Sequence, residues 1–567
     1  MQRLLKRLDF LKGLIKMTEN EYTELAALLF PDITETPEQC EQRFPKRQLK
    51  EGARVTRYAP SPTGFMHIGN LFSAFISERV AHTTGGVFYV RIEDTDKKRE
   101  VEGGVSGILR DLAAFGCTVD EGVISETEEK GEYGPYRQSN RREIYHVFAK
   151  SLVEKGFAYP CFCSAETLDE VRKQQEAEKK TTGYYGKYAR CRGLCFDEIK
   201  ENIKAGKPYV LRLRSPGKED GKVFFDDMIK GKIEMPENTQ DIVLLKTDGI
   251  PTYHFAHAVD DHLMGTTHVV RGDEWIASAP VHLQLFKLLG FKPPKYAHIA
   301  PLMKEEDGGK RKLSKRKDPE AAVSFYFEQG YPAVSVREYL LTLANSNYEE
   351  WHKVNKTASQ DDFPFNLKKM SSSGALFDLV KFDDVSKNVI SGMSADEMYE
   401  QIAAWAQKND PEFFKTFTSN PEFSRFIFTI DRSGKNPRKD IAKWSEVPEY
   451  TEYFYSAPAA FDMPENLSSA DIKEILEKYA ESYDGSADKD GWFAGIKALC
   501  EPLGFCPNVK EYKQNPDAFK GHVGDLSTVL RVAVTGRRNT PDLYEIMKLL
   551  GREEVVSRLK GAAEKLK

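Results

Sequence analysis

The sequence predicts a mixed α/β fold in which a parallel-sheet domain is split by an α+β insertion and followed by an all-α region. Three observations indicate this fold class. A strand–loop–helix–strand pattern occupies residues 54–92. At about residue 160 the composition changes to a cysteine cluster, a Lys/Glu/Gln-rich helical stretch and short strand-like runs. Beyond about residue 391 the chain is a succession of amphipathic helices.

The first of these patterns is typical of a Rossmann-type sheet. Arg54–Ala59 is an extended run with two β-branched residues, and Val87–Ile92 is a second apolar strand. Between them, prolines and a glycine at positions 60, 62 and 64 exclude regular structure. Apolar residues at helical spacing then continue until Gly85-Gly86. Such a loop lies at the carboxyl end of a parallel strand, where open α/β sheets bind ligands.

The loop chemistry favours a nucleotide. A helix N-terminus presents free N–H groups and favours phosphate. His67 adds a donor near the first turn, and Gly69 allows a ligand to approach the backbone closely. Taken alone, however, this stretch could equally be a proline-rich loop with an incidental histidine.

A basic motif further along the chain decides between these two interpretations. Lys310–Lys317 embeds Lys-Leu-Ser-Lys-Arg after a flexible Asp-Gly-Gly turn. Together with Pro-Ser-Pro-Thr-Gly-x-x-His-x-Gly upstream, it resembles the paired ATP-binding motifs of class I aminoacyl-tRNA synthetases. Arg91–Asp96, Asp248–Ala256 and His268–Trp275 narrow the resemblance to bacterial-type glutamyl-tRNA synthetases. The resemblance runs from about Arg54 to the C-terminus.

Whole-chain properties are consistent with such an enzyme. The 567 residues carry a net charge of −5, which argues against a non-specific nucleic-acid coat protein and requires segregated basic groups if tRNA binds. The eight cysteines form no disulfide framework. No apolar stretch reaches membrane-spanning length, and basic Met1–Lys16 lacks a signal-peptide core. We expect a cytoplasmic, monomeric protein in which Met1–Lys16 is dispensable.

We expect six segments along the chain. Residues 1–52 form an N-terminal helical extension, with a helix start at Thr18 and an apolar face of Leu25, Leu28, Leu29 and Phe30. Residues 53–159 and 241–300 are the two halves of the sheet domain, and Ile242–Leu245 returns the chain to the parallel sheet. Residues 160–240 are the insertion. By resemblance, the insertion grips the acceptor end of tRNA and residues 301–390, with the basic loop, contact its stem.

The remaining segment, residues 391–567, is expected to be helical. Its best-defined helix has Thr540 as N-cap, Pro541 at the first helical position and Gly551 beyond its end. An all-helical C-terminal region resembles the bacterial-type anticodon-binding domain. It differs from the β-barrel of typical glutaminyl-tRNA synthetases.

The resemblance implies two sets of site residues. The glutamate pocket would comprise Arg57, Ala59, Ser61, Glu93, Tyr253 and Arg271. Arg57 can bind a carboxylate with two parallel hydrogen bonds, and Glu93 would take the α-ammonium. ATP, with Mg²⁺ bridged by its phosphates, would contact His67, Gly69, Lys312, Lys315 and Arg316. Because glutamate itself attacks the α-phosphorus, no protein nucleophile is needed, and His67, Gly69 and Lys315 act by positioning and charge stabilisation. Trp275 is set aside as a core residue.

Four cysteines in the insertion predict a metal site. Cys161-x-Cys163 and Cys191-x-x-x-Cys195 are two short-spaced pairs, the arrangement from which tetrahedral Zn²⁺ sites are built. Gly193 stands where the family's pattern has a histidine, so Cys195 is the expected fourth ligand. Four thiolates would make this zinc structural; the alternative is that the cysteines are free.

The predicted function is a glutamate–tRNA ligase that forms glutamyl-adenylate from L-glutamate and ATP and transfers the glutamyl group to tRNA(Glu). One alternative is a glutamine-specific enzyme or a relaxed enzyme that also charges tRNA(Gln) with glutamate. Another is a non-catalytic tRNA-binding paralogue, which could tolerate loss of His67, Lys315 or Glu93; all three are present.

Overall fold

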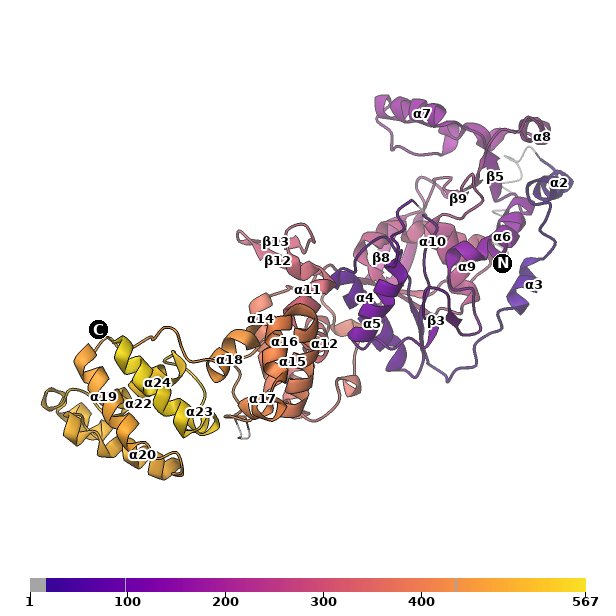
Figure 1. The fold of residues 1–567 in the computed structure, drawn as a ribbon. Coiled ribbons are helices and arrows are strands. Elements are labelled where there is room, and N and C mark those ends of the chain that lie inside the picture. Colours follow the sequence, from indigo (N-terminus) through magenta and orange to yellow (C-terminus); the bar gives the residue numbers. More distant parts are fainter. Residues whose placement is uncertain (1–16, 97, 433, 435, 567) are drawn as a thin grey trace. The chain divides into compact units, whose positions relative to one another are not determined.

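The structure is a computed structural model that describes residues 17–96, 98–432, 434 and 436–566 (Figure 1). The segment Met1–Lys16, expected to be dispensable, lies outside the described residues. The chain divides into two compact units. Unit 1 comprises Met1–Ser324 and Arg337–Asp378, and unit 2 comprises Phe325–Val336 and Leu379–Lys567.

The parallel sheet of unit 1 begins where the sequence predicts it. Strands β1 (Val55–Tyr58), β2 (Val87–Val90) and β3 (Glu121–Val123) are parallel neighbours, and β4 (Glu129–Lys130) pairs antiparallel with β3. A second parallel pair, β10 (His268–Gly272) and β11 (Lys295–Ile299), starts beside β1, because Thr267 N–H donates to the Val55 carbonyl at 3.0 Å. The carboxyl ends of β1, β2 and β10 therefore open on one side of unit 1.

Helix α4 (Ile68–His82) follows the proline loop and returns the chain to β2. Its apolar residues Leu71, Phe75 and Ile76 are at most 1% exposed, which confirms the helical spacing. The return requires Gly86: a Cβ there would lie 1.9 Å from the Arg54 carbonyl oxygen. Glycine thus lets the start of β2 approach β1.

The insertion has its own antiparallel sheet. Strands β5 (Ala158–Cys161), β6 (Val210–Leu213) and β9 (Val243–Leu245) pair in that order, and β7 (Lys222–Asp227) and β8 (Gly231–Pro236) form a hairpin. Helices α7 (Ala165–Ala177) and α8 (Phe196–Lys204) belong to the same segment. The expectation that Ile242–Leu245 rejoins the parallel sheet is wrong: β9 is antiparallel to β6.

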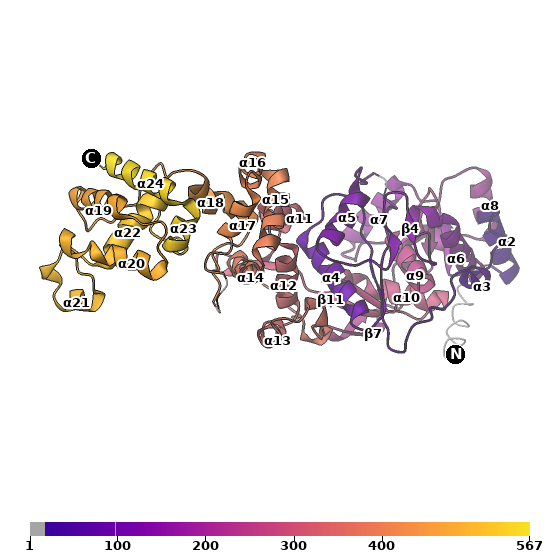
Figure 2. The same cartoon turned by 60° about the horizontal axis from the view of Figure 1, so that its bottom comes forward.

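The described part of the N-terminal extension, from residue 17 on, contains two helices and packs within unit 1. Helix α2 (Glu19–Leu29) starts at Thr18 as expected, with a capping box there, and α3 (Pro37–Gln42) follows it. In Figures 1 and 2 α2 lies beside α6 (Arg142–Glu154), with which it shares a hydrophobic core. Leu25, Leu29 and Phe30 are buried there, whereas Leu28 is 39% exposed and does not belong to the predicted apolar face.

The other regular elements of unit 1 are short helices and one hairpin. They are α5 (Gly104–Ala114), α9 (Tyr253–Leu263), α10 (Ala279–Leu289), α13 (Tyr348–Val354) and the antiparallel β12 (Met303–Glu306) and β13 (Gly309–Lys312). The division between the units falls within α11 (Val323–Gln329) and α12 (Ala333–Ala344).

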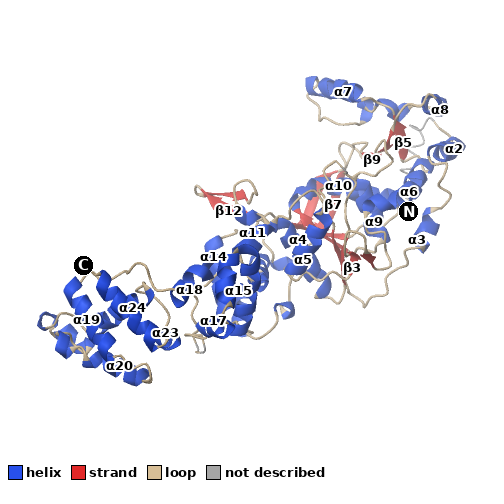
Figure 3. Cartoon of the chain, viewed as in Figure 1, coloured by secondary structure: helices blue, strands red, loops and turns tan. Residues whose placement is uncertain are grey.

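The regular elements of unit 2 are helices, which are blue in Figure 3. They enclose a hydrophobic core of their own. Its helices are α14 (Leu379–Ser391), α15 (Ala395–Asn409), α16 (Pro411–Thr418), α17 (Pro421–Ile427), α18 (Val447–Tyr455), α19 (Ser469–Ser482), α20 (Lys489–Ala498), α21 (Val509–Gln514), α22 (Val523–Thr535), α23 (Leu543–Leu550) and α24 (Arg552–Lys565).

One predicted helix start in unit 2 is wrong by two residues. The N-cap of α23 is Asp542, whose side chain accepts from Glu545 N–H, and not Thr540. The Thr540 hydroxyl and carbonyl instead accept hydrogen bonds from Arg531. None of the described helices is long and apolar enough to cross a membrane.

Candidate active site

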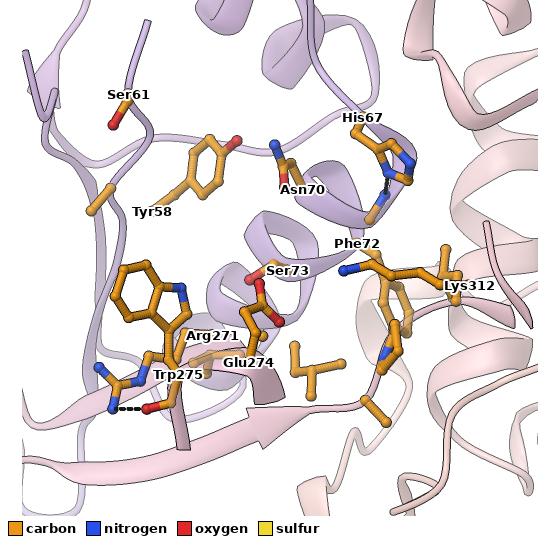
Figure 4. Close-up of a pocket in the computed structure, with 18 of the residues that line it drawn as sticks. Tyr58, Ser61, His67, Asn70, Phe72, Ser73, Arg271, Glu274, Trp275 and Lys312 are labelled. Carbon is orange, nitrogen blue, oxygen red and sulfur yellow. Dashed lines mark hydrogen bonds between the residues drawn. The ribbon is translucent and has the colours of Figure 1, made fainter. Parts of the chain in front are cut away.

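A cavity of about 470 Å³ opens at the carboxyl ends of β1, β2 and β10. Figure 4 shows Arg271 and Trp275 at one end of it and His67 and Lys312 at the other. The predicted site residues that line this cavity are Arg57, Ala59, Ser61, His67, Gly69, Glu93, Tyr253, Arg271 and Lys312. The structure thus brings together residues from distant motifs in the sequence.

His67 is fixed by the helix that it begins. It is the N-cap of α4, and its Nδ1 accepts the Gly69 N–H at 2.9 Å. Nδ1 therefore carries no proton, which leaves Nε2–H as the donor of a neutral ring. Burial and the nearby Lys315 and Lys312 lower the pKa of His67, which also keeps the ring neutral.

Buried charges underlie the opposite end of the cavity. Arg57 is 4% exposed, and its Nε lies 3.3 Å from Asp261 Oδ2. Arg91 contacts the same carboxylate at 2.7 Å and Glu93 at 3.2 Å. Asp261 is therefore shared by two guanidinium groups, and neither arginine is fully neutralised by it.

Glu93 lies three residues beyond the end of β2, and its pKa is shifted. Burial raises the pKa of Glu93 to about 7, against the opposing effect of Arg91 and Arg57. A buried carboxylate of this kind gains from binding a cation, because the cation restores its charged form.

An aromatic pair forms one wall of the cavity. Tyr253, the first residue of α9, packs against Trp275 with ring centroids 4.3 Å apart. Trp275, expected to be a core residue, is only partly buried and lines the cavity. A lone tryptophan beside a charged motif carries no sequence signal that separates these two roles.

The basic loop after β13 is shaped by a buried carboxylate. Asp318, 1% exposed, receives two hydrogen bonds from Arg311 at 2.6 and 2.7 Å and one from Ser314 N–H at 2.9 Å. Arg311 and these other donors hold the pKa of Asp318 well below its usual range. The loop is therefore closed around an anion, and no motif in the sequence singles out Asp318.

The three basic residues assigned to ATP occupy different positions. Lys312 lines the cavity, and Lys315 Nζ donates to the Phe65 carbonyl in the proline loop. Arg316 is exposed and does not line the cavity. Burial lowers the pKa of Lys315.

Three of the four insertion cysteines form a compact cluster. The thiol sulfurs of Cys161, Cys163 and Cys191 lie within 4.8 Å of one another, and the last two are 3.6 Å apart. Cys195 is not part of this cluster; it precedes α8, where its N–H donates to Glu198. The Tyr184 hydroxyl lies 3.3 Å from both Cys161 and Cys163 sulfurs.

This geometry fits a tetrahedral metal. With Zn–S distances of about 2.3 Å, thiolates of one zinc are roughly 3.8 Å apart. Cys163 and Cys191 have this spacing, all three sulfurs lie within 4.8 Å of one another, and the phenol oxygen of Tyr184 approaches two of them. The structure thus offers Tyr184 rather than Cys195 beside the three thiols.

Two protein-family models match the chain. A model described as tRNA synthetases class I (E and Q), catalytic domain, matches residues 54–383, and one described as an anticodon binding domain matches residues 510–563. The chain is thus a class I tRNA synthetase. It is 50% identical to a glutamate–tRNA ligase of Clostridium perfringens (strain SM101 / Type A), over 95% of this chain and 99% of that protein. It is 44% identical to the glutamate–tRNA ligase of Sorangium cellulosum (strain So ce56), over 94% of this chain and 99% of that one.

Solved structures agree with the sequence relatives. The glutamate tRNA ligase from Elizabethkingia meningosepticum CCUG26117, solved in complex with its amino acid, superposes with a TM-score of 0.75. It is 29% identical and covers 91% of this chain and 100% of its own. The chain belongs to the glutamate–tRNA ligase family.

The clostridial match also corrects one expectation. The resemblance inferred from the sequence begins at about Arg54, which implies no counterpart for residues 1–52 in typical family members. The share of this chain left unmatched is 5% of 567 residues, about 28, which is shorter than that segment. Part of the extension therefore has a counterpart in that relative.

Proposed function

We propose that this cavity activates L-glutamate with ATP and that the chain then transfers the glutamyl group to the 3′ end of tRNA(Glu). The observation that carries the proposal is the polarity of the cavity. Arg271 lies at one end, and the His67 ring and Lys312 lie at the other. Glu93 and Arg57 also line the cavity, and their charges, like that of Arg271, act on Tyr253. An amino acid and a polyphosphate fit these two ends in charge.

At the amino-acid end, each charged group of glutamate has a complementary side chain. Glu93 binds the α-ammonium, and its own charge is restored by that cation. Arg57 and Arg271 supply guanidinium N–H groups for the carboxylates. Tyr253, together with the backbone and side chains at Ala59 and Ser61, completes the walls.

At the ATP end, the chain positions phosphates and stabilises charge. The neutral His67 ring donates from Nε2, Gly69 leaves room beside it, and Lys312 faces the same space. Lys315 and Arg316 lie on the adjoining loop and meet the pyrophosphate as charge develops on it. Mg²⁺ accompanies ATP as its counter-ion and is bridged by phosphate oxygens.

The reaction needs no protein nucleophile. The α-carboxylate of glutamate forms a bond to the α-phosphorus, and the bond from that phosphorus to the bridging oxygen breaks, which releases pyrophosphate. The terminal ribose hydroxyl of tRNA then attacks the carbonyl carbon of the adenylate, and AMP leaves. Catalysis by positioning and charge stabilisation is sufficient for both steps.

Choice of tRNA is tested directly by charging. We expect purified enzyme to attach glutamate to tRNA(Glu) and not glutamine to either tRNA. Separate reactions with tRNA(Glu) and tRNA(Gln), each with both amino acids, distinguish a discriminating enzyme from a relaxed one that glutamylates tRNA(Gln). Absence of any glutamylated tRNA would contradict the proposal.

Three segments of the chain each bind a different part of the tRNA. Residues 160–240 bind the acceptor end, residues 301–390 the stem and residues 391–567 the anticodon region, in a monomeric cytoplasmic enzyme. The anticodon-binding family match at residues 510–563 supports the last assignment.

The insertion binds one structural zinc. Cys161, Cys163 and Cys191 would hold it, with Tyr184 as the fourth ligand, and the metal would supply cross-linking rather than catalysis. Metal analysis of protein purified without chelators should give one zinc per chain. Cys163→Ser should lose the metal and Cys195→Ser should retain it; a metal content well below one per chain would contradict the assignment.

A further inference from the structure

Arg271 is held by two imidazoles rather than by a carboxylate. Its Nε donates to His298 Nε2 at 3.0 Å, and one terminal nitrogen donates to His282 Nδ1 at 3.1 Å. The other terminal nitrogen donates to the Trp275 carbonyl at 3.4 Å, a bond drawn in Figure 4. Among the ion pairs of the described residues none involves Arg271, in contrast to Arg57 and Arg91.

The hydrogen-bond directions fix the protonation of both rings. Arginine has N–H donors and no acceptor, so both imidazole nitrogens that face it must be unprotonated. His298 therefore carries its proton on Nδ1, which lies 2.7 Å from Asp227 Oδ2. His282 carries its proton on Nε2, which donates to His254 Nδ1 at 2.9 Å. The two rings are opposite tautomers.

The surroundings of the rings favour their neutral forms. His282 is 0% exposed and lies between Arg271 on β10 and the rings of His257 and His254 on α9, and the positive charge of Arg271 disfavours a second proton on it. Burial and these neighbours hold the pKa of His282 well below its usual range. His298 is also 0% exposed; burial lowers its pKa, against the opposing effect of Asp227 on β7.

Neutral acceptors and carboxylates differ in their effect on the charge of Arg271. They orient the guanidinium without cancelling its charge. The three bonds use three of its five N–H groups and leave one on each terminal nitrogen, which suits a carboxylate that accepts two bonds. The face of the guanidinium is also fixed, with its carbon 4.6 Å from the centre of the Tyr296 ring.

We propose that His282 and His298 are positioning residues that present Arg271 to a carboxylate of the amino-acid substrate while leaving its positive charge uncompensated. The inference rests on the proposed function, which places Arg271 in the glutamate pocket. If either ring were protonated, its N–H would face an N–H of Arg271 and could not accept the hydrogen bond. A carboxylate at either position would instead neutralise the charge of Arg271.

A matched pair of variants tests the charge requirement. In His282→Asn the amide oxygen can replace Nδ1 as a neutral acceptor, whereas His282→Asp has nearly the same shape and adds a negative charge. We expect KM for glutamate to be at least tenfold higher in His282→Asp than in His282→Asn, with kcat and KM for ATP differing by less than about threefold. Equal KM values for glutamate in the two variants would overturn the inference.

Two further measurements keep the test decisive. If His282→Asp does not fold, histidine-ring nitrogen NMR of the wild-type protein at pH 7.5 should show His282 protonated only at Nε2 and His298 only at Nδ1; any other tautomer of His282 overturns the inference. Arg271→Gln separates the inference from the proposed function. If it leaves KM for glutamate unchanged, the pocket assignment itself fails. If it raises KM while the His282 pair behaves alike, only the positioning role fails.

Discussion

At the residue scale, a substitution of Lys315 tests whether the basic loop stabilises the transition state of glutamate activation. Its amine reaches the proline loop beside His67 and can contact phosphates when charge moves to pyrophosphate. We expect Lys315→Ala to slow activation by roughly 10²–10³, about 2.7–4 kcal/mol, with a smaller change in glutamate binding. ATP–pyrophosphate exchange in the presence of tRNA measures this. Lys317→Ala, an exposed lysine on the same loop, is the control; equal rates for the two variants would remove Lys315 from the mechanism.

A substitution of Arg57 tests how the pocket selects glutamate over glutamine. Loss of one partner of a buried charge pair costs roughly 2–5 kcal/mol, whereas neutral glutamine loses much less. Arg57→Gln should therefore narrow the preference for glutamate over glutamine, chiefly by lowering kcat/KM for glutamate. Wild-type kcat/KM for glutamate in this variant would show that the pocket is assigned wrongly.

We expect ionisation of Glu93 to affect binding and stability in opposite directions. As the pH rises, glutamate should bind more tightly, and the contribution of Glu93 to the free energy of unfolding should fall. Because its pKa is about 7 in the free protein, the binding form is lost below that pH, and KM for glutamate should rise by up to about tenfold per pH unit. The raised pKa also means that the folded protein binds more protons than the unfolded chain between the ordinary pKa and pH 7. The contribution of Glu93 to the free energy of unfolding therefore falls as pH rises through this window.

Glu93→Gln should consequently be inactive yet more stable. At pH 8 we expect the variant to gain about 1–3 kcal/mol in the free energy of unfolding, because an unfavourable buried charge is removed. At pH 4.5, where the wild-type carboxyl is protonated, the difference should vanish. Urea unfolding of ligand-free protein at both pH values gives the comparison, and a destabilised variant at pH 8 would contradict it.

At the scale of elements, the loop after β13 depends on Asp318. This carboxylate joins Arg311, Lys304 and the Ser314 N–H, so it sets the path of the chain that carries Lys315 and Arg316. We expect Asp318→Asn to raise KM for ATP roughly tenfold, the effect of losing about one charged hydrogen bond in the binding conformation. Glu306→Gln, which alters the exposed partner of the same arginine, should change it little. Similar KM values for ATP in the two variants would mean that Asp318 does not shape the loop.

Elements with local signals could be predicted from the sequence. Pro60, Pro62 and Gly64 fixed the loop, and Gly85-Gly86 fixed the end of α4, because these residues restrict or free the backbone directly. The start of α23 was displaced because Thr540 and Asp542 are both good N-caps, and only the hydrogen bonds of Arg531 to Thr540 settle which is used.

Features that depend on distant partners could not be predicted. The run that became β9 is apolar and short, and nothing in it distinguishes pairing with β6 from pairing in the parallel sheet. Tyr184 lies in no ligand pattern, and its approach to the thiols follows only from the folded insertion. His282 and His298 are single histidines among apolar residues, where a core role is the ordinary interpretation. Their contact with Arg271 is visible only when β10, α10 and β11 are assembled.

At the scale of the molecule, the two units should respond differently to ligands. Every residue that lines the candidate active site belongs to unit 1, whereas unit 2 has a separate helical core. A ligand stabilises only the structure that binds it, by about 2.7 kcal/mol when present at 100 times its Kd. Glutamate and ATP should therefore raise the midpoint of one calorimetric transition and leave a second one unchanged.

Core variants assign the two transitions. Leu530→Ala removes a side chain that is 1% exposed in the core of unit 2, and such a change costs about 2–5 kcal/mol. It should lower the ligand-insensitive transition, while Leu71→Ala, at 0% exposure on α4, should lower the ligand-sensitive one. A single transition that both variants lower and both ligands raise would show that the units unfold together. In that case the free energy of ligand binding in unit 1 is shared with unit 2, and cooperative unfolding links the candidate active site to the anticodon-binding region.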